Sequence, residues 1–143
     1  MKLIKEHITR FERGGDPYRK LGVGKIALID KWFSDLDIGS DRYTIDKDFN
    51  INVRGSLDLS GTNITSLLNN LNVGGYLYLE GTNITSLPND LSVGWSLDLR
   101  GTNITSLPDN LSVGENIWLS KNRKGKVYVP KHLKKKVKYM IIF

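Results

Sequence analysis

Apolar residues recur along the middle of the chain with a period of twenty residues. The block Gly-Thr-Asn-Ile-Thr-Ser-Leu begins at residue 61 and returns, letter for letter, at residues 81 and 101. Pairs of apolar residues two positions apart precede these blocks and continue after the last one, at Leu57-x-Leu59, Leu77-x-Leu79, Leu97-x-Leu99 and Ile117-x-Leu119. Such a repeat predicts a solenoid, in which each coil buries its apolar residues against the neighbouring coils.

Each coil has three predicted parts. The Leu-x-Leu pair places two apolar side chains on one face of a short strand. Gly61 and Asn63 then suit a tight corner. Pro88 and Pro108 indicate an extended return path, which two further apolar residues close. An earlier, partial copy indicates that the array begins near Phe49.

The pattern L-x-L-x-x-(N/T)-x-(I/L)-x-x-L-P resembles the twenty-residue, bacterial class of leucine-rich repeat. In that family a polar residue, commonly Asn, bonds backbone groups inside the corner. The resemblance assigns this place to Thr62, Thr82, Thr102 and Asn122. It implies parallel strands on a concave face that serves for contact, with extended or polyproline-II return segments. Leu68 replaces the proline of the pattern, so we expect a looser first return segment.

The repeats are flanked by segments predicted to cover the two open ends of the solenoid, where core and strand edges would otherwise be exposed. Residues 1–48 suit two helices, at residues 2–13 and at about residues 25–33. The second helix is expected to bury Ile26, Ile29, Trp32 and Phe33. We expect this leader to cap and stabilise the array, and a separate partner-binding module is the alternative.

The other flank contains a degenerate copy of the coil. Val129-Pro130 echoes an earlier Leu-Pro with two extra residues, and the apolar end that follows is expected to dock or pair. The predicted class is therefore α+β, in one folding unit. Its parts are a helical N-terminal cap at residues 1–48, leucine-rich repeats at residues 49–122 and a basic C-terminal cap at residues 123–143.

Composition and charge add to this picture. The chain lacks Cys, which excludes disulfides, thiolate metal sites and Cys nucleophiles. Its first residues meet charge before any long apolar stretch, so we expect a cytoplasmic protein without a signal peptide or membrane contact. Residues 57–120 hold one Arg against six acids, whereas residues 121–143 hold nine Lys/Arg and no acid. The net charge of +6 therefore combines an acidic middle with a strongly basic end.

Positions that vary between copies are the candidates for recognition. Aromatic residues, acids and one Arg collect at the outward positions of the predicted strands. The predicted partner-binding residues are Tyr76, Tyr78, Trp95, Asp98, Arg100 and Trp118. Tyr, Trp and Arg dominate protein–protein hot spots. The alternative is that these large side chains only cover a solvent-facing sheet through cross-strand pairing.

The basic end is the competing candidate site. Its residues are Lys124, Lys126, Lys131, Lys134, Lys135 and Lys136. Such a run of lysines contacts either phosphates or an acidic protein. The alternative is that it only keeps the solenoid soluble and discourages end-to-end stacking of solenoids. Tyr128 is the only aromatic residue expected among these lysines, so we expect no stacking platform for bases.

No nucleophile, base and orienting group can be assembled from the sequence, and no motif indicates a metal or other cofactor. We therefore expect a binding protein rather than an enzyme. A helical leader before nearly identical repeats resembles small proteins encoded by bacteriophages and prophages. This resemblance implies an inhibitor that binds a host protein, such as a defence component, in the host cytoplasm. Weak nucleic-acid or nucleotide binding through the basic end and self-assembly are the alternatives, and the oligomeric state stays open.

Overall fold

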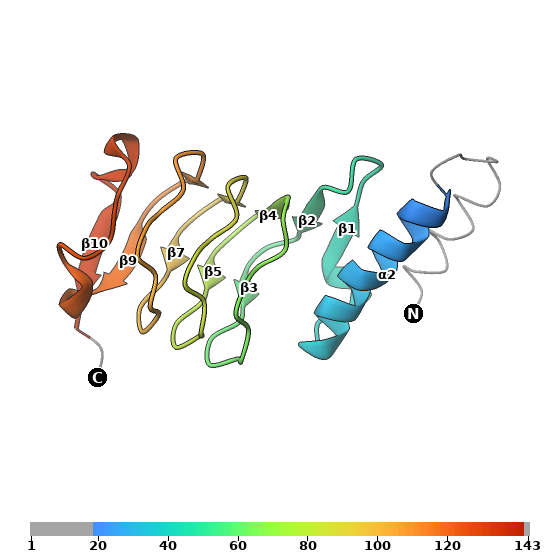
Figure 1. Ribbon diagram of the computed structural model, residues 1–143, viewed down its shortest axis with the longest axis horizontal. Coiled ribbons are helices and arrows are strands. Elements are labelled where there is room, and N and C mark those ends of the chain that lie inside the picture. The colour runs from blue at the N-terminus through green and yellow to red at the C-terminus, as the bar shows by residue number, and fades with distance from the viewer. Residues whose placement is uncertain (1–18, 142–143) are drawn as a thin grey trace. The chain divides into compact units, whose positions relative to one another are not determined.

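The computed structural model describes the backbone of residues 19–141 and the side chains of residues 24–141. The helix expected at residues 2–13 lies outside the described residues. The chain divides into two compact units, Met1–Ile51 and Asn52–Phe143. The described helix belongs to the first unit and the repeats to the second (Figure 1).

The described part of the first unit contains α2 (Arg19–Asp35), the 3-10 turn η1 (Ser40–Arg42) and β1 (Tyr43–Ile45). The helix includes the expected span and extends beyond it at both ends. Ile26, Ile29 and Phe33 are buried as predicted. The expectation for Trp32 is wrong, because this side chain is half-buried and contacts Phe33 edge to face. An indole ring is large and is rarely covered completely.

A buried polar pair joins α2 to β1. The Tyr43 hydroxyl donates a hydrogen bond to the carboxylate of Asp30, which has no exposed surface. The ring of Phe33 stacks on that of Tyr43, with 3.9 Å between the ring centroids. Burial, and then the neighbouring carboxylate, raise the pKa of Tyr43 far above its usual value. The phenol therefore stays protonated and remains a donor.

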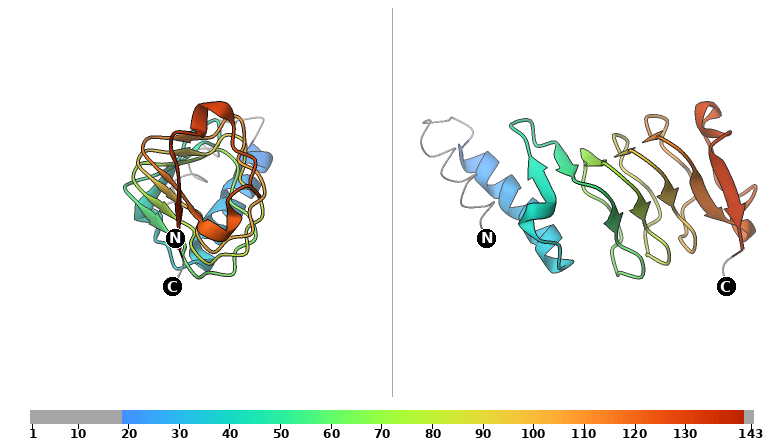
Figure 2. Two further views of the ribbon diagram at one scale, coloured as in Figure 1. Left: turned by 90° about the vertical axis from the view of Figure 1, so that its left-hand side faces the viewer. Right: turned by 180° about the vertical axis from the view of Figure 1, so that it is seen from behind.

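The second unit is a solenoid with two parallel sheets (Figure 2). One sheet, called here the β3–β10 sheet, contains β3 (Leu57–Asp58), β5 (Leu77–Tyr78), β7 (Leu97–Asp98), β9 (Ile117–Ser120) and β10 (Val137–Met140). The other, the β2–β8 sheet, contains β2 (Ile51–Val53), β4 (Leu71–Val73), β6 (Ser92–Val93) and β8 (Ser112–Val113). Paired residues of neighbouring strands lie twenty positions apart in the sequence, as Leu77 and Leu97 do. The repeat solenoid expected from the sequence is confirmed.

The segments that close each coil pair with one another in the β2–β8 sheet, which the expectation of an extended return path did not include. The backbone N–H of Ser112 donates to the carbonyl of Leu91 at 3.1 Å, and that of Gly94 donates to Val73 at 2.8 Å. An apolar-x-apolar segment is also the pattern of a half-buried strand. Because the coils that carry β4, β6 and β8 are each twenty residues long, these segments stack in register and satisfy their backbone groups by pairing. In the second coil, residues 79–91, which include the corner and Pro88, carry no strand.

The corner after each strand confirms the role expected for threonine. The hydroxyl donates to the carbonyl oxygen three residues earlier, at 2.7–2.8 Å, in Thr62, Thr82 and Thr102. The assignment of Asn122 to this place is wrong, because Asn122 is exposed within the 3-10 turn η2 (Lys121–Arg123). In this last corner Arg123 Nη2 instead donates to the carbonyl of Ile104 at 2.6 Å.

The coil with Leu68 turns differently from the coils with proline. In the latter, the N–H of Leu91 and of Leu111 donate back to the carbonyls of Pro88 and Pro108, at 3.3 and 3.2 Å. In the former, Asn70 adopts a left-handed conformation with φ of 60°, and β4 is three residues long instead of two. The replaced proline therefore changes the turn.

The backbones of successive coils touch at one corner between the two sheets. A Cβ added to Gly94 would lie 2.2 Å from the carbonyl oxygen of Gly74, and one added to Gly114 would lie 1.9 Å from that of Gly94. Real Cβ atoms do not approach backbone oxygens so closely. Glycine is therefore required there, so that the coils can stack at the spacing of a β-ladder.

The last coil first gains two residues and then loses two, so that its final strand pairs again with the residues twenty positions earlier. Tyr128 forms a parallel bridge with Ser106, an offset of two residues beyond twenty. The chain then shortens by the same amount, so Val137 again pairs with Ile117. This confirms the extra residues, and it confirms pairing for Tyr139 and Met140 of the predicted apolar end.

Candidate functional site

The outward side chains of the β3–β10 sheet stand in three columns, one residue from each coil. The middle column contains Asp58, Tyr78, Asp98, Trp118 and Lys138. Strand β10 also adds Met140 to the column that contains Ser120. Sequence reasoning missed these members from β10, because the two extra residues before them hid the register. The signal was Val137-x-Tyr139, which follows Ile117-x-Leu119 by twenty residues.

Five of the six predicted partner-binding residues line one hollow of about 320 Å³ on this face. They are Tyr76, Tyr78, Asp98, Arg100 and Trp118. Ser96 and Met140 complete the lining. We call this hollow the aromatic pocket. It draws on three successive coils and on the last strand, so the repeat itself brings these residues together.

The sixth residue, Trp95, stands beside the aromatic pocket and supports it. Its ring meets that of Tyr76 edge to face, with 5.0 Å between centroids and 75° between the planes. Tyr76 in turn stacks with Tyr78 at 5.6 Å and 27°. Aromatic pairs of this kind contribute about 0.5–1.5 kcal/mol each beyond their buried area. Half of Trp95 remains exposed, at 50% of its surface, so it offers a further apolar contact at the rim.

The charged residues of the aromatic pocket form a fixed network. Arg100 Nε lies 2.9 Å from Asp98 Oδ1, and Arg100 Nη2 lies 2.6 Å from Asp98 Oδ2. Arg100 Nη2 also lies 3.2 Å from Glu80 Oε2. Asp98 was expected to face solvent, but it is only 5% exposed, because the neighbouring side chains cover it. The hydrogen bond to Asp98, more than the other interactions, raises the pKa of the Arg100 guanidinium.

The backbone N–H groups that enter this face are also satisfied by side chains. Ser56 Oγ accepts from the N–H of Tyr76 at 2.9 Å, and Ser96 Oγ accepts from the N–H of Asn116 at 3.1 Å. These bonds link residues twenty apart in sequence. They connect neighbouring coils beside the strands that carry the aromatic rings.

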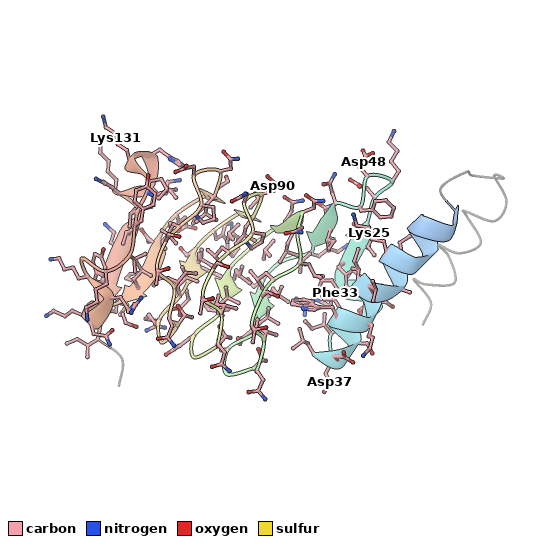
Figure 3. The ribbon with its side chains drawn as sticks, viewed as in Figure 1. Lys25, Phe33, Asp37, Asp48, Asp90 and Lys131 are labelled. Atoms are coloured by element: carbon pink, nitrogen blue, oxygen red, sulfur yellow. The ribbon has the colours of Figure 1, made fainter. Side chains whose placement is uncertain are left out.

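The basic end is built differently from the expected patch. Lys124, Lys126, Lys131, Lys134 and Lys135 are exposed, and Lys131 points away from the coils (Figure 3). Lys136 is half-buried, and its ammonium donates to the carbonyl of Val113 in β8. It lies at the last strand of the β2–β8 sheet, where it satisfies a carbonyl that would otherwise lack a ladder partner. Lys136 is therefore a capping residue.

Tyr128 is not the only aromatic residue at this end. Tyr139 lies on β10, and the Lys124 ammonium stands 6.0 Å from the centroid of its ring. Tyr128 itself is 60% exposed. The expectation of a basic surface with one aromatic residue is therefore wrong. Tyr139 directly follows Lys138 in the sequence, and the fold brings its ring close to Lys124 as well.

Within residues 24–141, no three His, Cys, Asp or Glu side chains gather closely enough to hold a metal ion. The longest helix of the described chain, α2, lacks the combination of length and apolar character that crossing a membrane requires. Comparison with family models, with curated proteins and with solved structures gave no match. The site must therefore be interpreted from its own geometry.

Proposed function

We propose that the second unit is a protein-recognition module that binds its partner through the aromatic pocket. The observation that carries this proposal is the convergence of five of the six predicted residues on one hollow. Tyr, Trp and Arg dominate binding energy when they stand in a well-packed centre. Met140 adds a flexible apolar contact at the same place.

Preorganisation supports binding over mere coverage of the sheet. Arg100 is tied to two carboxylates and Tyr76 is held between two other rings. Few side-chain rotamers are then lost when a partner docks, which lowers the entropic cost of association. If the aromatic rings only covered the sheet through cross-strand packing, no hollow would be expected between them, because the packed rings would fill that space.

Binding also fits the charges better than catalysis does. Both oxygens of Asp98 are engaged by Arg100, so this buried carboxylate is held as a structural ion pair and not as a base. We therefore maintain a non-enzymatic role without a cofactor. We propose the phage origin and the host partner from the resemblance given above, and the cytoplasmic location stays the expectation drawn from the sequence.

From the resemblance of the repeat pattern, we also propose that the coils belong to the leucine-rich repeat class. The threonine hydroxyls inside the corners support this assignment, since they bond the carbonyl three residues earlier. The pairing of the β2–β8 sheet is a feature that the resemblance did not imply.

Site-specific photo-crosslinking tests the proposed surface. p-Benzoylphenylalanine is placed at position 78 in the aromatic pocket, or at position 112 on the exposed side of β8 as the matched control. We expect irradiation in host cells to give a defined heterologous product from position 78 and none from position 112. The product should disappear with Trp118→Ala. Equal products from both positions would contradict the proposal, and a product of twice the chain mass would replace it with self-assembly.

A further inference from the structure

The end of the solenoid core opens into a second hollow, of about 360 Å³, at the last coil. We call it the C-terminal pocket. Its apolar lining comes from Val127, Val129, Val137 and Tyr139. Val137 and Tyr139 occupy the register positions of Ile117 and Leu119, which are fully buried one coil earlier. Val137 and Tyr139 are only half-buried, because no further coil among the described residues covers them.

The strand that borders the C-terminal pocket is also the last of its sheet. In the earlier coils, the inward residues donate their N–H to the next coil: Leu97 to Asn116 at 2.9 Å and Leu99 to Trp118 at 2.8 Å. Within the described chain β10 pairs only with β9. By the same register, the N–H groups of Val137 and Tyr139 therefore face outward. An edge of this kind receives an added strand from another segment.

Ile141, the residue that follows β10, lies at another part of the surface. Ile141 lines a different hollow, with Ser120, Lys121 and Asn122. Within residues 24–141, no other segment therefore fills the C-terminal pocket or pairs with the β10 edge. An occupant that filled the one and paired with the other would continue the solenoid by one rung.

The charge around this end decides what that occupant is. Residues 121–143 carry nine Lys/Arg and no acid. Lys134 lines the C-terminal pocket, and Lys138 projects from β10 on the outer face. Two such ends would repel each other, so a second copy docked through the same end is disfavoured. A nucleic-acid backbone would satisfy the lysines but would leave the apolar hollow and the strand edge unused.

We propose that the C-terminal pocket and the β10 edge together bind an extended, acidic segment of a partner protein. The segment pairs in parallel with β10. Two apolar side chains at alternate positions enter the hollow beside Val137 and Tyr139, and Asp or Glu residues between them face Lys138 on the outer side. This site is separate from the aromatic pocket and goes beyond the function proposed for it.

The test uses full-length chain and a labelled peptide of alternating type, Glu-Val-Glu-Leu-Glu-Val-Glu, in fluorescence anisotropy at low salt. We expect saturable binding that weakens as salt is added. A peptide with Ser at the three apolar positions keeps the charge and should bind at least tenfold more weakly. Equal binding of the two peptides would overturn the proposal, since charge alone would then account for it.

Variants of the chain locate the bound peptide. Lys138→Glu should weaken binding at least tenfold, whereas Lys131→Glu, which changes the net charge equally at an exposed position outside the C-terminal pocket, should weaken it far less. Tyr78→Ala should leave binding unchanged, which separates this site from the aromatic pocket. Equal losses from Lys138→Glu and Lys131→Glu would overturn the location on β10.

Amide hydrogen exchange gives the readout for pairing. The bound peptide should slow exchange at the N–H groups of Val137 and Tyr139. Unchanged exchange at both, or displacement of the peptide by a short DNA duplex that binds more tightly, would overturn strand addition in favour of a phosphate-binding surface.

Discussion

Arg100 holds the carboxylate of Asp98 by both oxygens, with Nε at 2.9 Å from Oδ1 and Nη2 at 2.6 Å from Oδ2. Asp98 also accepts the backbone N–H of Arg100 at 3.1 Å, so the pair closes a ring within one strand and its following corner. The carboxylate is buried, while a quarter of the Arg100 side chain is exposed, at 26%. Asp98 therefore depends on Arg100 to balance its buried charge, whereas Arg100 can also be solvated by water.

Arg100→Leu is expected to lower the free energy of unfolding by about 2 kcal/mol, because it leaves a buried carboxylate with fewer donors. The double variant Asp98→Leu with Arg100→Leu should recover much of this loss, since it removes both charges. Urea denaturation of the two variants and the parent measures the difference. A double variant less stable than Arg100→Leu would show that the pair adds stability beyond satisfying its own charges.

Tyr78→Ala with Trp118→Ala is expected to leave a cooperatively folded chain, because both rings are only half-buried. Affinity for the crosslinked partner should fall at least tenfold, or about 1.4 kcal/mol. Isothermal titration against the purified partner provides the measurement. An unchanged affinity in the folded double variant would move the binding site away from the aromatic pocket.

Gly94→Ala is expected to lower the free energy of unfolding by more than about 2 kcal/mol, since the new methyl group would overlap a backbone oxygen that cannot move alone. Gly24→Ala in α2 is the matched control, because nothing lies within 4 Å of the added atom. It should instead raise stability, by up to about 1 kcal/mol. Thermal unfolding of both variants would reveal the contrast, and equal effects would contradict the close approach of the coils.

Asp46 should titrate below its usual range. Its carboxylate accepts the N–H of Asn50 and of Asp48, both at 2.9 Å, and the hydrogen bond from Asn50 is the largest cause of its lowered pKa. A lowered pKa in the folded state means that the stabilisation is present above the unfolded-state pKa and is lost as the pH falls through the folded one. Carboxyl NMR titration gives the value directly. In Asp46→Asn, acid unfolding should begin at the same pH as in the parent chain, or the free energy of unfolding should fall less steeply as the pH is lowered. A steeper fall than in the parent would contradict this assignment.

The repeat made the fold and most of the aromatic pocket predictable. Leu97-x-Leu99 indicates which side of the strand is inward, so the outward columns follow from counting. The burial of Asp98 could not be predicted by counting positions in this way. A residue on the outer face of a short strand is expected to meet water, and its burial depends on how Trp118 and Arg100 lie over it.

The C-terminal part shows where counting fails. The offset at Tyr128 shifts the chain by two residues and a shorter return removes the shift, so neither change is visible in the local pattern. The role of Lys136 was hidden for a related reason. Its bond to Val113 exists only because the β2–β8 sheet ends one coil before the β3–β10 sheet does.

The strict twenty-residue register gives this molecule a modular path of evolutionary change. A tandem duplication of residues 81–100 would insert one coil that fits its neighbours on both sides, since every ladder bond connects equivalent positions. The insertion would move Trp118 away from Tyr78 by about 4.8 Å, the spacing of one strand. The original hollow would be divided while the core stayed intact. Gain or loss of whole coils can therefore remodel what the protein recognises without first solving a new folding problem.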